Sequence, residues 1–185
     1  MAYNNYNTMK KIILTIAAVF MVSMVLAQEN AVKVLSGYQG FWDQGTSYRL
    51  VEEPGYTVGF STTHGCYFKN KTFVGIGLGL ERSDSFFFVP IYSAVKYNFG
   101  YSKKVTPTMQ LRLGGWLGNG VAPYTDLAFG LRFGSSKDFA VNVMLTGTLY
   151  AGMKRREHCY NADGYYSYIV KYTLPVVGLR VGFEL

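Results

Sequence analysis

Hydrophobic and polar residues alternate with a period of two over most of the chain beyond residue 30. In the clearest segment, 72–82, one face carries branched aliphatic residues and the other carries glycines and Glu81. Successive side chains of a β-strand point to opposite faces, so this period predicts strands. We predict eight of them, at about residues 32–42, 56–68, 72–82, 86–99, 108–117, 124–133, 139–150 and 174–185.

The predicted strands are long, at about 10 to 14 residues each, whereas strands of globular proteins usually have roughly 5 or 6. A tilted strand needs about 9 to 11 residues to cross a bilayer. One face of each strand is Leu, Val, Phe and Ile, and the other is Gly, Thr, Asn and single charges. A membrane barrel turns its apolar face to lipid, and closure satisfies every backbone group. We therefore predict an all-β fold, an eight-stranded antiparallel up-and-down transmembrane β-barrel over residues 28–185.

A cleavable signal helix is predicted before the barrel. Two lysines after Met9 precede an apolar run of 15 residues, and small residues lead to cleavage between Ala27 and Gln28. This order is that of a secretory signal peptide, over residues 1–27. The run is shorter than the roughly 20 residues of a membrane-spanning helix, which argues against an anchor. Translation from Met9 would make residues 1–8 a non-native extension.

Composition agrees with a β-rich envelope protein. Aromatic residues make up 17% of the chain and charged residues 16%, against roughly 25% charged in an ordinary soluble domain. This mixture is too apolar for a disordered chain. The net charge is +7, but the basic residues are scattered along the strands without a stripe or motif. We therefore predict no nucleic-acid partner.

The connections between the predicted strands differ in length. Three are short and polar, at 69–71, 100–106 and 134–138, and with the N-terminus in the periplasm they fall on the periplasmic side. The external connections are 43–55, 83–85, 118–122 and 152–168, and two of them are long, as in outer-membrane barrels. Residues 165–170 are expected to extend the last hairpin above the membrane. Aromatic residues near predicted strand ends are interpreted as interface girdles: Trp42, Tyr56, Tyr97, Tyr150 and Tyr172.

The inward face of the predicted barrel carries charges. An eight-stranded barrel is just wide enough to be filled by side chains, and buried charges need partners. We therefore predict an ion-paired plug rather than an open pore, with Glu81, Asp126 and Glu184 among its acids. The alternative is that several of these charges lie at the rims in water. The predicted interior polar network is Lys33, Glu81, Lys96, Arg112, Asp126, Arg132, Arg180 and Glu184.

No catalytic, cofactor or metal site is predicted. His64 falls near the periplasmic end and His158 in the last external loop, so they do not form a common site. The same topology separates Cys66 from Cys159, so both are predicted to be unpaired despite export. Ser61 faces inward and His64 outward in the predicted register, which argues against their joint use in catalysis.

Four segments resemble the small outer-membrane β-barrel proteins of Bacteroidetes-type bacteria: residues 61–68 (STTHGCYF), 73–79 (FVGIGLG), 89–92 (VPIY) and 178–185 (GLRVGFEL). The resemblance covers essentially the whole mature chain. It implies a Gram-negative outer-membrane location and a barrel, but no reaction. The last strand, 174–185, also resembles the signal read by the outer-membrane insertion machinery, although it ends in Leu185 rather than in an aromatic residue.

We expect a monomer with a structural or surface-interaction role in the cell envelope and no wide pore. Its expected partners are outer-membrane lipid and lipopolysaccharide, whose phosphates could meet the run 154–156 (KRR), unless that run is simply solvated. Tyrosines of the last loop, Tyr160, Tyr165 and Tyr166, are candidates for stacking on carbohydrate. The alternatives are a narrow channel for small or hydrophobic molecules, a lipid A-modifying enzyme and a soluble secreted β-protein.

Overall fold

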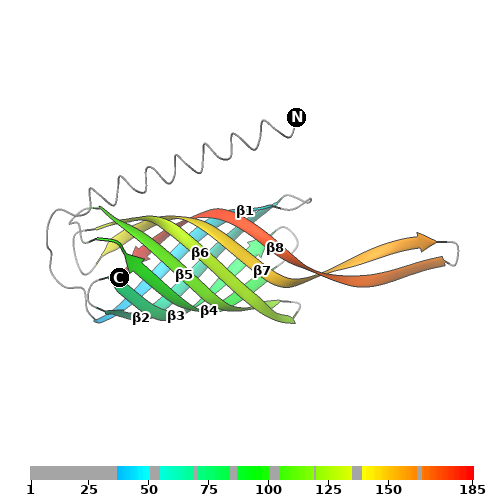
Figure 1. The fold of residues 1–185 in the computed structure, drawn as a ribbon, viewed down its shortest axis with the longest axis horizontal. Coiled ribbons are helices and arrows are strands. Elements are labelled where there is room, and N and C mark those ends of the chain that lie inside the picture. Colours follow the sequence, from blue (N-terminus) through cyan, green and yellow to red (C-terminus); the bar gives the residue numbers. More distant parts are fainter. Residues whose placement is uncertain are drawn as a thin grey trace, which may run out of the picture.

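Eight antiparallel strands pair in chain order and close into a barrel through β1 and β8 (Figure 1). The computed structural model describes residues 37–50, 55–68, 71–83, 87–100, 105–118, 120–134, 139–161 and 164–185, leaving aside the side chains of 120 and 154–166. The strands are β1 (Gly37–Arg49), β2 (Tyr56–Phe68), β3 (Thr72–Ser83), β4 (Phe87–Asn98), β5 (Val105–Gly118), β6 (Gly120–Phe133), β7 (Ala140–Asn161) and β8 (Gly164–Glu184). The predicted eight-stranded up-and-down barrel is confirmed. The predicted signal peptide lies outside the described residues, which contain no helix long and apolar enough to span a membrane.

The barrel has two distinct ends. The connections β1–β2, β3–β4, β5–β6 and β7–β8 share one end, which we call the hairpin end. The other three connections and Leu185 share the opposite end, which we call the terminal end. Figure 1 shows β7 and β8 continuing as a two-stranded ribbon well beyond the hairpin end of the barrel.

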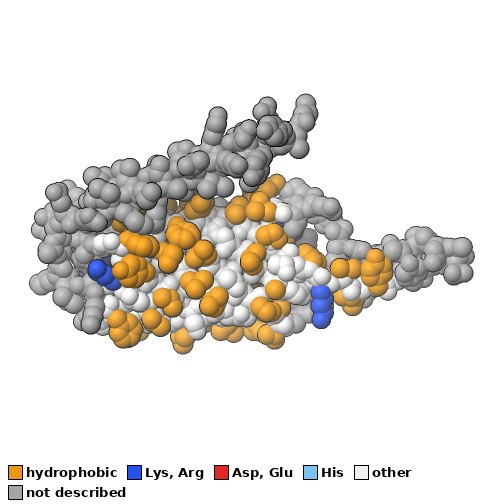
Figure 2. Space-filling view, in the orientation of Figure 1, with side chains coloured by type: hydrophobic (Ala, Val, Ile, Leu, Met, Phe, Trp, Pro, Cys, Tyr) orange, Lys and Arg blue, Asp and Glu red, His pale blue; other side chains and the backbone are white. Residues whose placement is uncertain are grey.

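The outer wall is apolar, whereas the interior holds charged and polar side chains together with aromatic rings. On β3, Val74, Ile76 and Leu78 are exposed on the outer wall, whereas Phe73 and Glu81 face the interior. Figure 2 shows hydrophobic side chains spread over the visible wall, with Lys and Arg only toward its ends. A soluble barrel has the reverse arrangement, so this outer wall is built to face lipid.

Strand β1 is longer than the sequence pattern predicted. Residues 43–55 were expected to form a loop, but the strand continues to Arg49 and pairs there with β8. The prediction was wrong because Gln44 and Thr46 occupy outward positions, where apolar residues were required. The inward positions of the same strand continue without interruption through Asp43.

Other strand boundaries also move outward from their predicted places. β5 begins at Val105 and β6 at Gly120, so the loops before them are shorter than expected. β7 continues past Tyr150 to Asn161, and β8 begins at Gly164. The expected hairpin extension at 165–170 is therefore present, and it involves both strands.

A β-bulge marks the point where the barrel becomes the ribbon. Ala151 and Gly152 of β7 together stand opposite Thr173 of β8. Gly152 has a φ of 70°, in the left-handed region that glycine adopts at little cost. The indole Nε1 of Trp116 donates to the Ala151 carbonyl oxygen at 3.1 Å, which gives this carbonyl a partner. Because of the extra residue, Met153 points inward, as Tyr150 does before the bulge.

Inward glycines make room for aromatic rings inside the narrow barrel. The ring of Phe73 lies against Gly65 and Gly75, and a Cβ atom on Gly75 would stand 2.7 Å from that ring. Gly77 is placed in the same way beside the ring of Tyr92, at 2.6 Å. The inward glycines therefore leave space that the neighbouring aromatic rings fill.

The predicted aromatic girdle is only partly present. Tyr56 is exposed at the hairpin end, and Tyr97 is half-buried near the terminal end, both on the outer wall. Trp42 faces outward but lies at the middle of β1, because that strand is longer than predicted. Tyr150 is buried in the interior and Tyr172 is half-buried on the inward face of the ribbon. These three placements correct the girdle interpretation.

Candidate functional site

The interior of the barrel gathers most of the charges of the described part of the chain. All the acidic side chains described there point inward: Asp43, Glu81, Asp126 and Glu184. They face buried cations from four different strands: Lys96, Arg112, Arg132 and Arg180. A buried charge needs a partner of opposite sign and hydrogen bonds to its other polar atoms. The contacts fall into two groups along the barrel axis.

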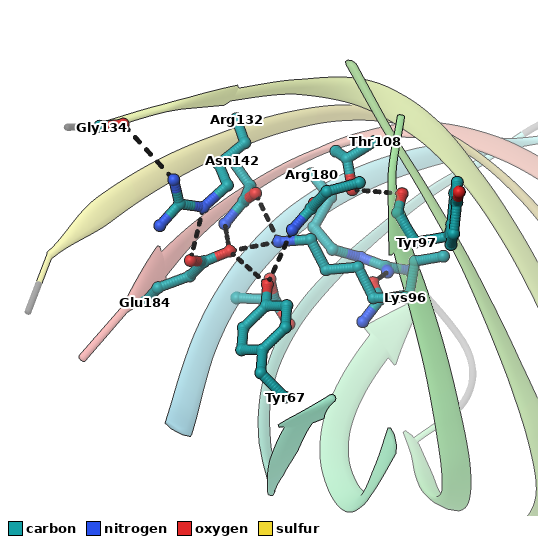
Figure 3. Close-up of polar contacts among 12 residues, drawn as sticks. Tyr67, Lys96, Tyr97, Thr108, Arg132, Gly134, Asn142, Arg180 and Glu184 are labelled. Carbon is teal, nitrogen blue, oxygen red and sulfur yellow. Dashed lines mark hydrogen bonds and ion pairs between the residues drawn. The ribbon is translucent and has the colours of Figure 1, made fainter. Parts of the chain in front are cut away.

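One group lies near the terminal end and is centred on the carboxylate of Glu184 (Figure 3). We call it the terminal cluster: Tyr67, Lys96, Arg132, Asn142 and Glu184. The Nε of Arg132 lies 2.7 Å from Glu184 Oε2. The ammonium of Lys96 forms an ion pair with Glu184 Oε1. The same oxygen accepts hydrogen bonds from Asn142 Nδ2 at 3.1 Å and from the Tyr67 hydroxyl at 3.3 Å.

Lys96 is held on several sides although its side chain is completely buried. Besides Glu184, it donates to the Oδ1 of Asn142 at 2.7 Å. Its Nζ also lies 4.6 Å from the ring centroid of Phe41, within the range of a cation–π contact. These contacts replace the water that a lysine ammonium has at a protein surface.

The second group lies at mid-barrel, and we call it the central cluster: Asp43, Ser61, Gln110, Arg112, Asp126, Thr148 and Arg180. Arg180 Nη2 lies 2.7 Å from Asp126 Oδ1, and Thr148 donates to Oδ2 of the same carboxylate at 2.8 Å. The other guanidinium, of Arg112, forms an ion pair with Asp43 and donates to the Ser61 hydroxyl at 3.1 Å.

The central cluster is extended by neutral partners. Arg180 Nη1 donates to the Oε1 of Gln110 at 3.2 Å. The Arg112 guanidinium lies 4.7 Å from the ring centroid of Tyr92. Each cation thus meets one carboxylate and at least one neutral group, which is the arrangement that makes a buried ion pair tolerable.

Aromatic rings fill the interior between the central cluster and the hairpin end. We call them the aromatic layer: Phe88, Tyr92, Trp116, Tyr124 and Tyr150. Phe88 stacks on Tyr150 with centroids 5.0 Å apart and meets Trp116 edge-on at 5.3 Å. The hydroxyl of Tyr150 donates to the carboxylate of Glu81. The aromatic layer therefore covers the central cluster from the hairpin end.

A small cavity remains beside the central cluster. It has a volume of about 40 Å³ and is lined by residues that include Asp43, Glu81, Arg112 and Arg180. A cavity needs roughly 10–15 Å³ for one water molecule, so this one holds only a few. Its polar lining suits ordered water and leaves no room for a solute.

The structure places seven of the eight predicted network residues inside the barrel, and the eighth, Lys33, lies outside the described residues. It brings Lys96, Arg132 and Glu184 together in the terminal cluster. In the central cluster, Asp126 pairs with Arg180. Arg112 belongs to the same cluster through its ion pair with Asp43. The last of the seven, Glu81, accepts a hydrogen bond from Tyr150 and lines the cavity.

Sequence reasoning missed Asp43, the acidic partner of Arg112. The predicted loop at 43–55 removed it from the barrel, although it continues the inward series of β1. The neutral members Asn142 and Thr148 belong to the Gly, Thr and Asn face of the predicted strands, but their contacts were not predicted. Partners of this kind come from strands far apart in the sequence, and strand periodicity contains no information about them.

The histidine and cysteine residues do not form a site in the described part of the chain. His64 is exposed on the outer wall, where it is hydrogen-bonded to Tyr38 at 2.6 Å and to Thr62 at 2.9 Å. Ser61 faces the interior, so the barrel wall separates it from His64. Cys66 is free and lies near the terminal end, whereas Cys159 belongs to the ribbon at the other end. No group of three or more metal-binding side chains occurs in this part of the chain.

Comparison with known proteins supports the fold. No protein-family model and no curated protein matches the chain. The solved structure of Neisserial surface protein A (NspA) is 10% identical, with a TM-score of 0.60 over 83% of this chain and 99% of that chain. The N-terminal β-barrel domain of Pseudomonas aeruginosa OprF is 14% identical, with a TM-score of 0.49 over 81% of this chain and 99% of that chain.

At such identities, a structural likeness shows the fold alone. This likeness and the apolar outer wall together show that the chain has the fold of an outer-membrane β-barrel. The resemblance to the Bacteroidetes-type barrels stays a prediction, because these comparisons include no such family.

Proposed function

We propose that this protein is a closed outer-membrane barrel with a structural or surface-interaction role, and that it does not conduct solutes. The observation that carries the proposal is the filled interior. The terminal cluster, the central cluster and the aromatic layer follow one another along the axis, and the cavity of about 40 Å³ is too small for a solute.

The proposal also concerns the ribbon formed by β7 and β8 beyond the bulge. Outer-membrane barrels have short periplasmic turns and longer extracellular loops, so the hairpin end is assigned to the outside. Ile169 and Tyr168 of the ribbon are 60% and 43% exposed. Apolar and aromatic residues presented by a projecting hairpin suit contacts with other molecules at the cell surface.

Single-channel recording in planar bilayers tests whether the barrel is closed. The full chain is expected to give no steady conductance. The double variant Asp43→Ala/Arg112→Ala, which empties part of the central cluster, is expected to give openings. The matched control Ile76→Ala/Leu78→Ala changes only the lipid-facing wall and should be silent. A steady large conductance of the unaltered protein would refute the proposal.

The placement of the candidate catalytic residues gives less support to the alternative of a lipid A-modifying enzyme. The serine and histidine that come close in sequence, Ser61 and His64, face opposite sides of the wall. Ser61 is also the hydrogen-bond acceptor of Arg112 in the central cluster. A change in the lipid A mass spectrum on deletion of the gene would favour this alternative.

Recognition of β8 by the outer-membrane insertion machinery is part of the same proposal. The strand alternates exposed residues such as Leu179 and Phe183 with the buried Arg180 and Glu184 up to the end of the barrel. Replacement of Phe183 by a polar residue is expected to reduce insertion in cells, measured by fractionation and by the shift of the unboiled protein on a gel.

A further inference from the structure

The outer wall of the barrel has most of its polar side chains on one pair of strands. Between the two rims of the barrel, the described outward residues of β3, β5, β7 and β8 are apolar or glycine. Those of β4 and β6 include one hydroxyl each, from Ser93 and Thr125. The outward faces of β1 and β2 instead have four polar side chains: Gln44, Thr46, Thr62 and His64. One stretch of a wall that is built to face lipid is therefore polar.

Two of these four side chains have hydrogen-bond partners within the wall, and two do not. The ring nitrogens of His64 are hydrogen-bonded to Tyr38 at 2.6 Å and to Thr62 at 2.9 Å. Gln44 and Thr46 are exposed, and neither side chain has a hydrogen bond among the described residues. Gln44 has the greater need of a partner, because its amide has two N–H donors and an acceptor oxygen.

Gln44 lies at the depth of the hydrocarbon core. On β1 it stands between Tyr38, near the terminal end, and Tyr48, which meets Tyr56 at the hairpin end with ring centroids 5.4 Å apart. Tyrosines at strand ends lie at the membrane interfaces. The ten residues from Tyr38 to Tyr48, at roughly 3.3 Å each and a tilt near 40°, span about 25 Å, which is the height of the apolar band. Acyl chains at this depth offer the Gln44 amide neither a donor nor an acceptor.

The surroundings of Gln44 have the composition of an interface core. Trp42 precedes it on the outward face of β1, and Phe60 stands directly opposite it on β2. The two rings meet edge-on with centroids 5.6 Å apart, and they are 48% and 44% exposed. Large aromatic residues at the centre of a patch are characteristic of protein–protein contacts. We call this part of the wall the wall patch: Trp42, Gln44, Thr46, Phe60 and Thr62.

The chemistry of Gln44 favours a second copy of this chain as the partner. Two barrels inserted in the same direction can be related by a two-fold axis along the membrane normal, and the same residue of each copy then lies at the same depth. A primary amide is self-complementary, since an N–H group of each copy can donate to the oxygen of the other. Between two lipid-facing surfaces there is no hydrophobic driving force, so hydrogen bonds and close packing decide association.

We propose that two copies of this chain pair in the membrane through the wall patch, with Gln44 of each copy hydrogen-bonded to Gln44 of the other. A monomer was expected from the sequence, in which residues 43–55 were assigned to a loop and Gln44 was not part of the wall. The inference goes beyond the proposed function, since it depends neither on a closed interior nor on which end of the barrel is outside. It requires only that the outer wall faces lipid.

Single-molecule photobleaching of the labelled full chain in lipid vesicles tests the proposal, because it counts the copies in each complex as the protein density is varied. The unaltered chain is expected to show a fraction of pairs that rises with density. Gln44→Leu removes the amide at similar volume and should weaken pairing about tenfold or more. The matched control is Thr125→Val, which removes an outward hydroxyl on β6 and should leave pairing unchanged.

Disulfide formation in the same vesicles locates the contact. In a chain with Cys66→Ser and Cys159→Ser, the variant Gln44→Cys should form a cross-linked dimer on oxidation, because the two-fold axis brings the two Cα atoms close together. The control variant Ile91→Cys places its thiol on the exposed wall of β4, away from the wall patch, and should stay monomeric.

Three results would overturn the inference: single copies at every density, equal pairing of Gln44→Leu and the unaltered chain, or equal cross-linking of Gln44→Cys and Ile91→Cys, which would indicate random collision. The unboiled gel shift verifies that each variant is a folded barrel. Channel recordings report on the closed interior independently, so failure of this inference and failure of the proposed function are distinguishable.

Discussion

Arg180 Nη2 lies 2.7 Å from Asp126 Oδ1, and this ion pair joins β8 to β6, two strands that do not hydrogen-bond to each other. Both side chains are buried in the interior. The pair therefore bridges the barrel across β7, and its contribution differs from that of a surface ion pair, which is worth little.

Removal of one partner of this pair should destabilise the barrel strongly. Asp126→Leu leaves the Arg180 guanidinium buried without its carboxylate, and we expect the free energy of unfolding to fall by about 3–5 kcal/mol. The double variant Asp126→Leu/Arg180→Leu should recover much of the loss. Urea unfolding in lipid vesicles, followed by tryptophan fluorescence, measures both. Losses that simply add in the double variant would contradict the pairing.

The terminal cluster should depend on the charge of Glu184 more than on its neutral contacts. Glu184→Gln removes the negative charge faced by Lys96 and Arg132, so we expect a loss of about 3 kcal/mol or more. Tyr67→Phe removes two long hydrogen bonds, one donated to Glu184 at 3.3 Å and one accepted from Asn98 at 3.4 Å, and should cost about 1–2 kcal/mol. Equal effects of the two variants in the same unfolding assay would show that the charge is not the main contribution.

The close fit of Phe73 against glycine should make one methyl group costly. In Gly75→Ala the new Cβ atom would stand 2.7 Å from the Phe73 ring and 2.5 Å from a backbone oxygen. We expect a loss of about 1–3 kcal/mol from this overpacking. Gly147→Ala is the matched control, because its Cβ atom would have no neighbour nearer than 4.0 Å. A control variant as unstable as Gly75→Ala would exclude crowding as the cause.

The bulge should tolerate only glycine at its left-handed position. Gly152→Ala is expected to cost about 1–2 kcal/mol, because a Cβ atom is strained at a φ of 70°. Limited proteolysis of the purified protein should then cleave the ribbon faster than in the unaltered chain. Gly115→Ala, which adds a Cβ atom in ordinary contact distance, should leave the cleavage rate unchanged.

The two cysteines should be accessible from opposite sides of the membrane. Cys159 lies in the ribbon and Cys66 near the terminal end. A membrane-impermeant maleimide is therefore expected to label Cys159 on intact cells and Cys66 only after lysis. Mass spectrometry of the non-reduced protein should show no link between them, and finding such a link would refute the topology as well.

Strand periodicity predicted the barrel because every strand has one face in lipid. β3 is the clearest case, since its outward residues from Val74 to Leu80 are all branched aliphatic and its inward residues between Phe73 and Glu81 are glycines. β1 was predicted less well, because Gln44 and Thr46 interrupt the apolar series on its outward face. The rule of apolar outward residues is a statistical one, and two polar exceptions were enough to end the predicted strand early.

The interior charges were predicted as a set but not as pairs. Alternation assigns Arg112 and Asp126 to the inward face, and neighbouring strands even place them opposite each other. In the structure, however, Arg112 pairs with Asp43 and Asp126 with Arg180, which come from strands across the interior. Partner choice depends on how the closed barrel staggers its strands, and only the three-dimensional register contains that information.

The position of two interior charges on the last strand has a consequence for assembly. Arg180 and Glu184 belong to β8, and the side chains they neutralise, Asp126, Lys96 and Arg132, belong to β4 and β6. A sheet in which β8 is not yet in place has three charges without counter-ions. Closure of the sheet by β8 and pairing of these interior charges are therefore coupled, because neither is complete without the other.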